Sequence, residues 1–118
     1  MTYDVFVNDI QLAVKIGLFP EERSKIQTLI CDLKIKVKPV AHGFDDINNT
    51  VNYYALTEMI MQKASNTNFL LLEALADYLL NEILAFGPIV NCQITLKKPY
   101  IMQVLGAGGC GVIMERSQ

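Results

Sequence analysis

The sequence TLICDLKIKVKP, residues 28–39, alternates between apolar and polar side chains and ends in a proline. Alternation with a period of two indicates a β-strand that has one face in the protein core and the other in water. The apolar positions are Leu29, Cys31, Leu33, Ile35 and Val37, and the polar ones are Asp32, Lys34, Lys36 and Lys38. The alternating lysines therefore indicate the solvated face of a strand and not a patch that binds nucleic acid.

A second strand pattern precedes this one. Its apolar side chains lie at positions 3, 5 and 7 and then at 10, 12, 14 and 16, so the phase changes at Asn8-Asp9 and a β-bulge is expected there. Gly17 ends the strand, and residues 19–25 (FPEERSK) are expected to form a polar loop or irregular turn. The two strands together predict one long antiparallel hairpin with a wide connection.

Two helices are expected in the middle of the chain. The first begins between Thr50 and Asn52 and runs to about Ser65, and residues 66–68 (NTN) then provide a break and a cap for the second. The second helix stops at Gly87-Pro88. The buried side of the first helix is expected to carry Leu56, Met59, Ile60 and Ala64. The second helix has apolar side chains at a spacing of three to four residues: Leu72, Leu75, Ala76, Leu79, Leu80 and Ile83.

Two further strands complete the pattern, one over residues 90–97 and one over residues 112–115. The order ββααββ predicts an α+β fold in a single domain over residues 1–118, with a four-stranded antiparallel sheet and two helices on one face. The edge strands of such a sheet must be covered or paired. Joining these edges between subunits produces a ring, so we expect a homo-oligomer.

The composition argues against several classes of function. The formal net charge is −2 and the basic residues are dispersed, which is not typical of a protein that binds nucleic acid. No stretch reaches the ~18–20 apolar residues of a membrane span, and the N-terminus lacks the regions of an export signal, so a cytoplasmic protein with no membrane partner is expected. With His42 as the single histidine and no CxxC pair, no metal is expected.

The glycine-rich run 106–111 leaves no room for the helix that follows a dinucleotide-binding loop, so we interpret it as a flexible entry into the last strand.

Lys98 departs from the pattern of its own strand. Position 98 continues the inward phase of residues 90, 92, 94 and 96, whereas Lys97 falls on the solvated face. An amine that is partly shielded from water, directly before Pro99, is suited to proton transfer. The alternative is a lysine at the end of a strand that extends its amine into water.

Glu73 departs from its helix in the same way, because it lies in phase with Ala76 and Leu80. A carboxylate near a helix N-terminus is favoured by the helix dipole and can accept two hydrogen bonds from the N–H pair of a pterin or guanine. The alternative is a first-turn glutamate that is open to solvent.

Of Tyr53 and Tyr54, one is expected to pack inward. Glu22 lies in the polar loop, where an exposed glutamate is the usual finding.

The order and spacing of these residues resemble the dihydroneopterin aldolase family of the folate pathway over nearly the whole chain. Each matching segment is weak alone, but together they are specific, although the glycine-rich run is denser than the family pattern. The segments are Ile16-Gly17, Glu22-Arg23 with Gln27, Asp45-Asp46-Ile47, Thr50-Val51-Asn52-Tyr53, Phe69-Leu70-Leu71-Leu72-Glu73 with Leu75-Ala76, Lys98-Pro99 and Glu115-Arg116.

The resemblance implies the tunnelling fold, in which subunits join their sheets into a tetrameric ring, often stacked as an octamer, with active sites between neighbouring subunits. It implies that Glu73 and the backbone of Leu72 hold the amino-pyrimidine edge of a pterin. It also implies three catalytic residues, two of which bind the substrate as well. Lys98 is the general acid and base, Tyr53 comes from the neighbouring subunit and packs by the pterin ring, and Glu22 places the substrate side chain and a water. The implied reaction is retro-aldol cleavage of 7,8-dihydroneopterin, with no cofactor and no metal.

Two other functions stay open from the residues. An epimerase on the same scaffold would invert the side-chain hydroxyl of dihydroneopterin or its triphosphate, since cleavage and re-addition on the other face gives that product. A non-catalytic pterin- or purine-binding scaffold would keep Glu73 as its anchor. It would have no need for Lys98, Tyr53 and Glu22.

Overall fold

The computed structural model describes residues 1–38, 43–99 and 106–118. Along the chain the described elements are β1 (Tyr3–Val14), α1 (Pro20–Arg23), β2 (Gln27–Val37), a 3-10 turn η1 (Ile47–Asn49), α2 (Tyr53–Ser65), α3 (Leu72–Leu84), β3 (Ile89–Lys98) and β4 (Cys110–Ser117). The predicted order of strands and of the two long helices is therefore confirmed, and α1 and η1 are additions to it.

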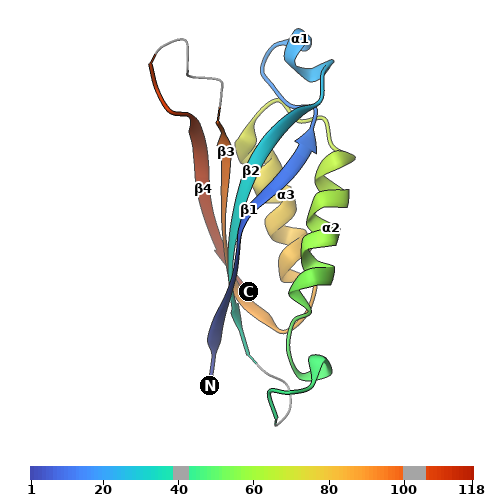
Figure 1. Ribbon diagram of the computed structural model, residues 1–118, viewed down its shortest axis with the longest axis vertical. Helices are drawn as coiled ribbons and strands as arrows, with labels where there is room; N and C mark the ends of the chain where they lie inside the picture. The colour runs from blue at the N-terminus through green and yellow to red at the C-terminus, as the bar shows by residue number, and fades with distance from the viewer. Residues whose placement is uncertain (39–42, 100–105) are drawn as a thin grey trace.

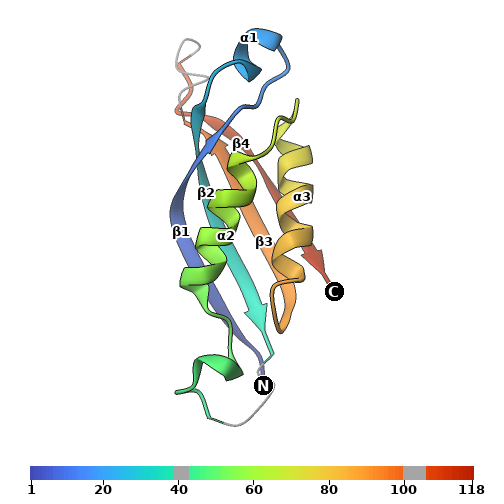
Figure 2. The same ribbon diagram turned by 90° about the vertical axis from the view of Figure 1, so that its right-hand side faces the viewer.

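The four strands form one antiparallel sheet in the order β1-β2-β3-β4. Helices α2 and α3 both cover the same face of this sheet and leave the other face open (Figures 1 and 2). The sheet thus has β1 and β4 at its two edges, as expected for a fold that pairs its edges between subunits.

The predicted β-bulge lies in β1. The register between β1 and β2 shifts between Val7 and Ile10, and Asp9 has a φ of 58°, which is the left-handed conformation. The backbone N–H of Asp9 donates a hydrogen bond of 2.8 Å to Oδ1 of Asp32 in β2. This bond lowers the pKa of the Asp32 carboxyl below its ordinary value, with a smaller contribution from Lys97. The carboxylate of Asp32 therefore serves as the partner of the backbone group that the bulge frees.

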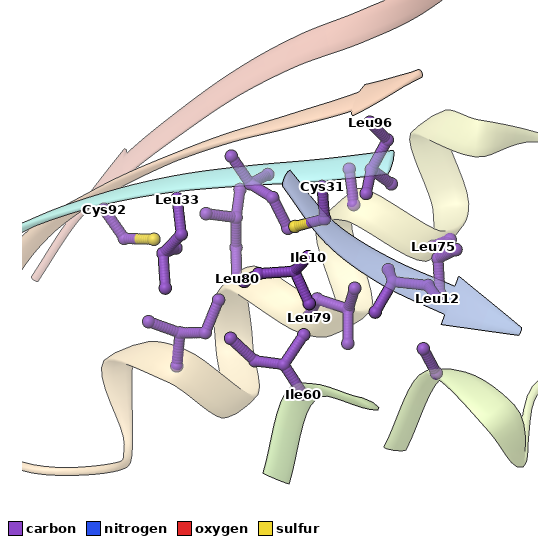
Figure 3. Packing of buried hydrophobic residues seen from close by; sticks show 14 of the residues in the cluster. Ile10, Leu12, Cys31, Leu33, Ile60, Leu75, Leu79, Leu80, Cys92 and Leu96 are labelled. Atoms are coloured by element: carbon purple, nitrogen blue, oxygen red, sulfur yellow. The ribbon is translucent and has the colours of Figure 1, made fainter. Parts of the chain in front are cut away.

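The core lies between the helices and the covered face of the sheet (Figure 3). Every inward position predicted for β2 is buried, including Cys31, and Cys92 of β3 is buried beside the same cluster. Burial raises the pKa of the Cys31 and Cys92 thiols to about 12. Both cysteines are therefore thiols in the core, as the sequence predicts, whereas Cys110 is exposed.

Two local predictions are wrong. Residues 19–25 contain the short helix α1, because Pro20 stands at the first helical position and Glu21 and Glu22 fill the first turn. Residues 66–68 do not cap α3: Leu71 precedes it with no side-chain cap, and the Thr67 hydroxyl instead donates to the Ala64 carbonyl at the end of α2. Met59 is partly buried and packs against the core beside Leu56, Ile60 and Ala64, so the predicted buried side of α2 is confirmed.

The last strand is longer than predicted and takes in part of the glycine-rich run. It begins at Cys110, and Gly111 pairs with Lys97 of β3. A Cβ atom on Gly111 would lie 2.0 Å from the Leu96 carbonyl oxygen, so the two strands approach too closely there for any other residue. Gly111 is therefore part of the sheet and does not belong to a flexible entry.

Candidate functional site

The side chain of Lys98 points toward the covered side of the sheet at the end of β3. Only 14% of it is exposed, compared with 45% for its neighbour Lys97. Lys97 lies on the open face, where its amine is 3.1 Å from Oδ2 of Asp32. The predicted inward position of Lys98 is confirmed, and the alternative of an amine extended into water does not describe it.

Glu22 is the acidic partner of Lys98. It lies in α1, and its Oε2 atom is 3.6 Å from the Nζ atom of Lys98. Its side chain is 25% exposed, so Glu22 is not the exposed glutamate that is usual in a loop: the α1 turn folds the carboxylate against the end of β3. The other carboxylate oxygen, Oε1, accepts a hydrogen bond of 3.4 Å from the backbone N–H of Phe19. The carboxylate is thus held between the α1 turn and the amine.

Glu73 and Leu72 open helix α3 at the same end of the molecule (Figure 2). Leu72 is buried, whereas Glu73 is exposed, so the expectation that Glu73 lies within the buried stripe is wrong for a single protomer. The cause is its place in the first turn, at the margin of the apolar stripe. In the described part of the chain, no hydrogen bond or ion pair from another residue occupies its carboxylate. The group is therefore available to a ligand.

A backbone hydrogen bond connects the two parts of this end. The N–H of Gly17, which precedes α1, donates to the carbonyl of Phe69, which precedes α3, over 3.3 Å. The segment that carries Glu22 is thereby fastened to the segment that leads into Glu73. The structure thus gathers Lys98, Glu22, Leu72 and Glu73 at one end of the protomer.

Tyr53 is not part of this group within one protomer. It is the first residue of α2, and α3 follows the far end of that helix (Figure 2). A helix of 13 residues is about 20 Å long, so Tyr53 lies roughly a helix length away from the end that carries Glu73. Tyr53 and Tyr54 are 60% and 72% exposed, and the expectation that one of them packs inward is wrong. The inward positions at the start of α2 are instead taken by Val51 and Leu56, which are 3% and 0% exposed.

The described residues contain no group of three or more His, Cys, Asp or Glu side chains that could hold a metal ion. His42 lies outside the described residues. None of the described helices has both the length and the apolar character needed to cross a bilayer.

A hollow of about 590 Å³ lies on the open face of the sheet, between Asp9, Ile30 and Lys97 and the start of β4. It is separate from the cluster around Lys98, because Lys97 and Lys98 point to opposite faces.

An antiparallel ββααββ sheet, with its helices on one face and a lysine and two glutamates at one end, defines a protein of the tunnelling-fold class. Residues 5–115 match the family model of FolB, dihydroneopterin aldolase. The chain is 30% identical to a dihydroneopterin aldolase of Methylorubrum extorquens over 117 residues, which cover 96% of this chain and 90% of the relative. The chain belongs to the dihydroneopterin aldolase family.

Solved structures of this family have the same fold. The FolB protein of Vibrio cholerae superposes with a TM-score of 0.88 at 27% identity, covering 98% of both chains. Escherichia coli dihydroneopterin aldolase, crystallised in complex with neopterin, gives a TM-score of 0.83 at 25% identity, covering 98% of this chain and 99% of the other. The fold predicted from the sequence is thereby confirmed.

Sequence reasoning alone did not find the contact between Glu22 and Lys98. Glu22 and Lys98 are far apart in the chain, and no local sequence pattern predicts that α1 contacts β3. The resemblance named both residues without giving their distance. The signal that was available locally is the proline followed by two acidic residues, which indicates that a helical turn begins at Pro20.

Proposed function

We propose that this protein cleaves 7,8-dihydroneopterin by a retro-aldol reaction into 6-hydroxymethyl-7,8-dihydropterin and glycolaldehyde, as a step of folate biosynthesis in the cytoplasm. The observation that carries the proposal is the Lys98 amine, largely shielded from water and 3.6 Å from the Glu22 carboxylate, at the end of the protomer that also presents Glu73. Membership of the family and the neopterin complex of the E. coli relative support a pterin as the substrate.

The reaction requires proton transfers and no external electron acceptor. The proton of the C2′ hydroxyl is removed, the C1′–C2′ bond breaks, and its electron pair moves into the conjugated C=N of the pterin ring. The C2′ side leaves as glycolaldehyde, and a proton is then added to C1′ to give the hydroxymethyl product. General acid–base catalysis by a positioned side chain contributes about 10²–10⁴-fold to such a reaction.

The side chains divide this work. Lys98 is the general acid and base, because its amine is largely shielded from water and lies 3.6 Å from the carboxylate of Glu22. Glu22 places the side chain of the substrate and a water. Glu73, which has no partner among the described residues, accepts hydrogen bonds from the amino-pyrimidine edge, with the backbone of Leu72 beside it. Charge-assisted hydrogen bonds of this type are about twice as strong as neutral ones.

Tyr53 completes the site from a neighbouring subunit. Its place at the opposite end of α2 and its exposed ring support this assignment, since within one protomer Tyr53 lies about a helix length from Glu73. Pairing of β1 with β4 between copies would bring Tyr53 of one copy to the site of the next in a homo-oligomer. We propose a tetrameric ring, or two stacked rings that form an octamer.

The test is incubation of the purified protein with 7,8-dihydroneopterin under anaerobic conditions, followed by quantification of glycolaldehyde and of the two pterin products. Equal amounts of glycolaldehyde and hydroxymethyl-dihydropterin are expected. If the only product is the dihydropterin with its side-chain hydroxyl inverted, the protein is an epimerase. If neopterin binds and no product forms, it is a binding scaffold. Either of these two results overturns the proposal.

A further inference from the structure

The α1 turn has little of its own to hold it in place. It is four residues long and none of them is buried, so it gains no stability from the core. Arg23, its last residue, links the turn to the segment before it: Nη1 donates to the carbonyl of Gly17 over 2.9 Å and to the carbonyl of Leu18 over 3.0 Å. One guanidinium nitrogen therefore closes the turn onto the chain that enters it.

The acceptors show that Arg23 does not act as a countercharge. In the part of the chain that the structure describes, it forms no ion pair with Glu21, Glu22 or any other carboxylate. Both of its hydrogen bonds go to backbone carbonyls, which carry no net charge. Its contribution is therefore to the geometry of the turn.

Gly17 connects this geometry to Glu22. A Cβ atom on Gly17 would lie 2.4 Å from the Cβ and 2.7 Å from the Cδ of Glu22, and its φ of 152° is itself unfavourable for other residues. The side chain of Glu22 therefore lies directly on the backbone of Gly17, while Arg23 holds the carbonyl of the same residue. Moving Gly17 relative to α1 would move the Glu22 carboxylate relative to Lys98.

We propose that Arg23 is a positioning residue that fixes the Glu22 carboxylate beside the Lys98 amine by tying α1 to Gly17 and Leu18. This inference rests on the proposed function for its effect on turnover. It does not depend on that function for its effect on the loop. A displacement of about 1 Å in a catalytic group can reduce turnover by about 10²-fold, so a residue without substrate contact can have a large effect.

The experiment compares Arg23→Met, Arg23→Lys and Lys25→Met with the wild type. Met removes both hydrogen bonds and keeps much of the aliphatic stem, whereas Lys restores a donor of nearly the same reach. Lys25→Met is the matched control, because it removes a positive charge from the same loop. The Lys25 side chain has no hydrogen bond or ion pair among the described residues.

The first measurement is amide hydrogen exchange over residues 17–25 in the substrate-free protein. Arg23→Met is expected to exchange about tenfold faster there, a modest net effect for two hydrogen bonds because water can bond to the carbonyls that are freed. Arg23→Lys is expected to restore most of the protection, and Lys25→Met to leave it unchanged. If exchange in Arg23→Met equals that of the wild type, the proposal is wrong, whatever reaction the protein catalyses.

The second measurement is a double-mutant cycle on kcat with Glu22→Gln. Arg23→Met is expected to lower kcat on the order of tenfold or more in the wild-type background, with affinity for neopterin nearly unchanged. In the Glu22→Gln background the same change is expected to cost little, because the group it positions is already gone. Equal losses in both backgrounds would show that Arg23 acts by another route and would overturn the proposal.

The two measurements separate the possible failures. If wild-type protein releases no glycolaldehyde, the proposed function fails, and exchange still decides whether Arg23 holds the turn. If Arg23→Met does not fold, as judged by circular dichroism, Arg23→Gln takes its place. Its shorter side chain cannot reach both carbonyls, and the same increase in exchange is expected.

Discussion

The Nζ atom of Lys98 lies 3.6 Å from Oε2 of Glu22, while the adjacent Lys97 lies 3.1 Å from Oδ2 of Asp32 on the opposite face of the sheet. Two consecutive lysines thus have separate acidic partners in different surroundings. The Lys97 pair is largely open to water, where such ion pairs contribute about 0–1 kcal/mol. The Lys98 pair is shielded by the α1 turn. This difference makes Lys97 a natural control for Lys98.

Lys98→Met is expected to reduce kcat by about 10²–10⁴-fold and to leave the affinity for neopterin close to that of the wild type, because the amine transfers protons and does not anchor the ring. Steady-state assay of glycolaldehyde release and equilibrium binding of neopterin give the two values. Lys97→Met should retain most of the activity. Turnover that survives in Lys98→Met would remove this lysine from the mechanism.

Glu73→Gln is expected to weaken pterin binding about 10- to 100-fold, since hydrogen bonds to a charged group contribute about 1.5–3 kcal/mol and the new amide presents a donor to the donors of the ligand. Isothermal titration with neopterin measures the change. Glu82→Gln, near the other end of α3, serves as the control because its partner is Lys63, 3.7 Å away. Equal affinity of the Glu73→Gln and wild-type proteins would rule out this carboxylate as the anchor.

A shared site predicts complementation between two inactive proteins. Tyr53→Ala and Lys98→Met are each expected to be poorly active alone, but co-expression should restore part of the activity. In a mixed ring, roughly a quarter of the interfaces combine an intact Tyr53 from one chain with an intact Lys98 from the next. Tyr54→Ala is the matched control. Failure to recover activity in mixed oligomers, verified by differently tagged chains, would place both groups in a site of one chain.

Asp32→Asn is expected to lower the free energy of unfolding by about 1 kcal/mol at neutral pH, because the hydrogen bond from Asp9 and the pair with Lys97 favour the charged carboxylate. The native pKa of Asp32 is below the ordinary value of 3.8, so this contribution is complete above that value and is lost as pH falls through the native pKa. Urea denaturation at neutral pH and near pH 3 should therefore show the difference from wild type closing in acid. A difference that persists in acid would assign the effect to something other than charge.

Thiol labelling should distinguish the three cysteines. Burial raises the pKa of Cys31 and Cys92 to about 12, so neither thiol ionises appreciably at neutral pH, whereas Cys110 is exposed. A chromogenic disulfide reagent is expected to modify one thiol per chain in the native protein and three after unfolding. Cys110→Ser should abolish the native reaction. Rapid native labelling of this variant would contradict the packing of the core.

The strands and their bulge could be predicted because alternation is a local property of the sequence. The phase change at Asn8-Asp9 is visible in the pattern itself, and the structure places the register shift there. The inward position of Lys98 was predictable for the same reason. Burial of Glu73 and of a tyrosine at 53 or 54 was not. Glu73 lies at the margin of its apolar stripe, and Val51 and Leu56 take the inward positions at the start of α2.

The rest of the site depends on contacts between distant segments. The contact from Glu22 of α1 to Lys98 of β3 joins segments far apart in the chain, and the bond from Gly17 to Phe69 joins two loops that no sequence period relates. From the sequence, Arg23 stands out only as part of a family motif. Its hydrogen bonds to the carbonyls of Gly17 and Leu18 are seen only in the folded structure.

The separation of Tyr53 from Lys98 along one protomer has a genetic consequence. On the proposed assembly every polypeptide serves two catalytic centres, giving its tyrosine to one and its lysine to another. A chain with substitutions at both Tyr53 and Lys98 would therefore inactivate the two catalytic centres to which it contributes. In a cell that also expresses the normal allele, such a variant should behave as a dominant negative, with losses greater than its share of the chains.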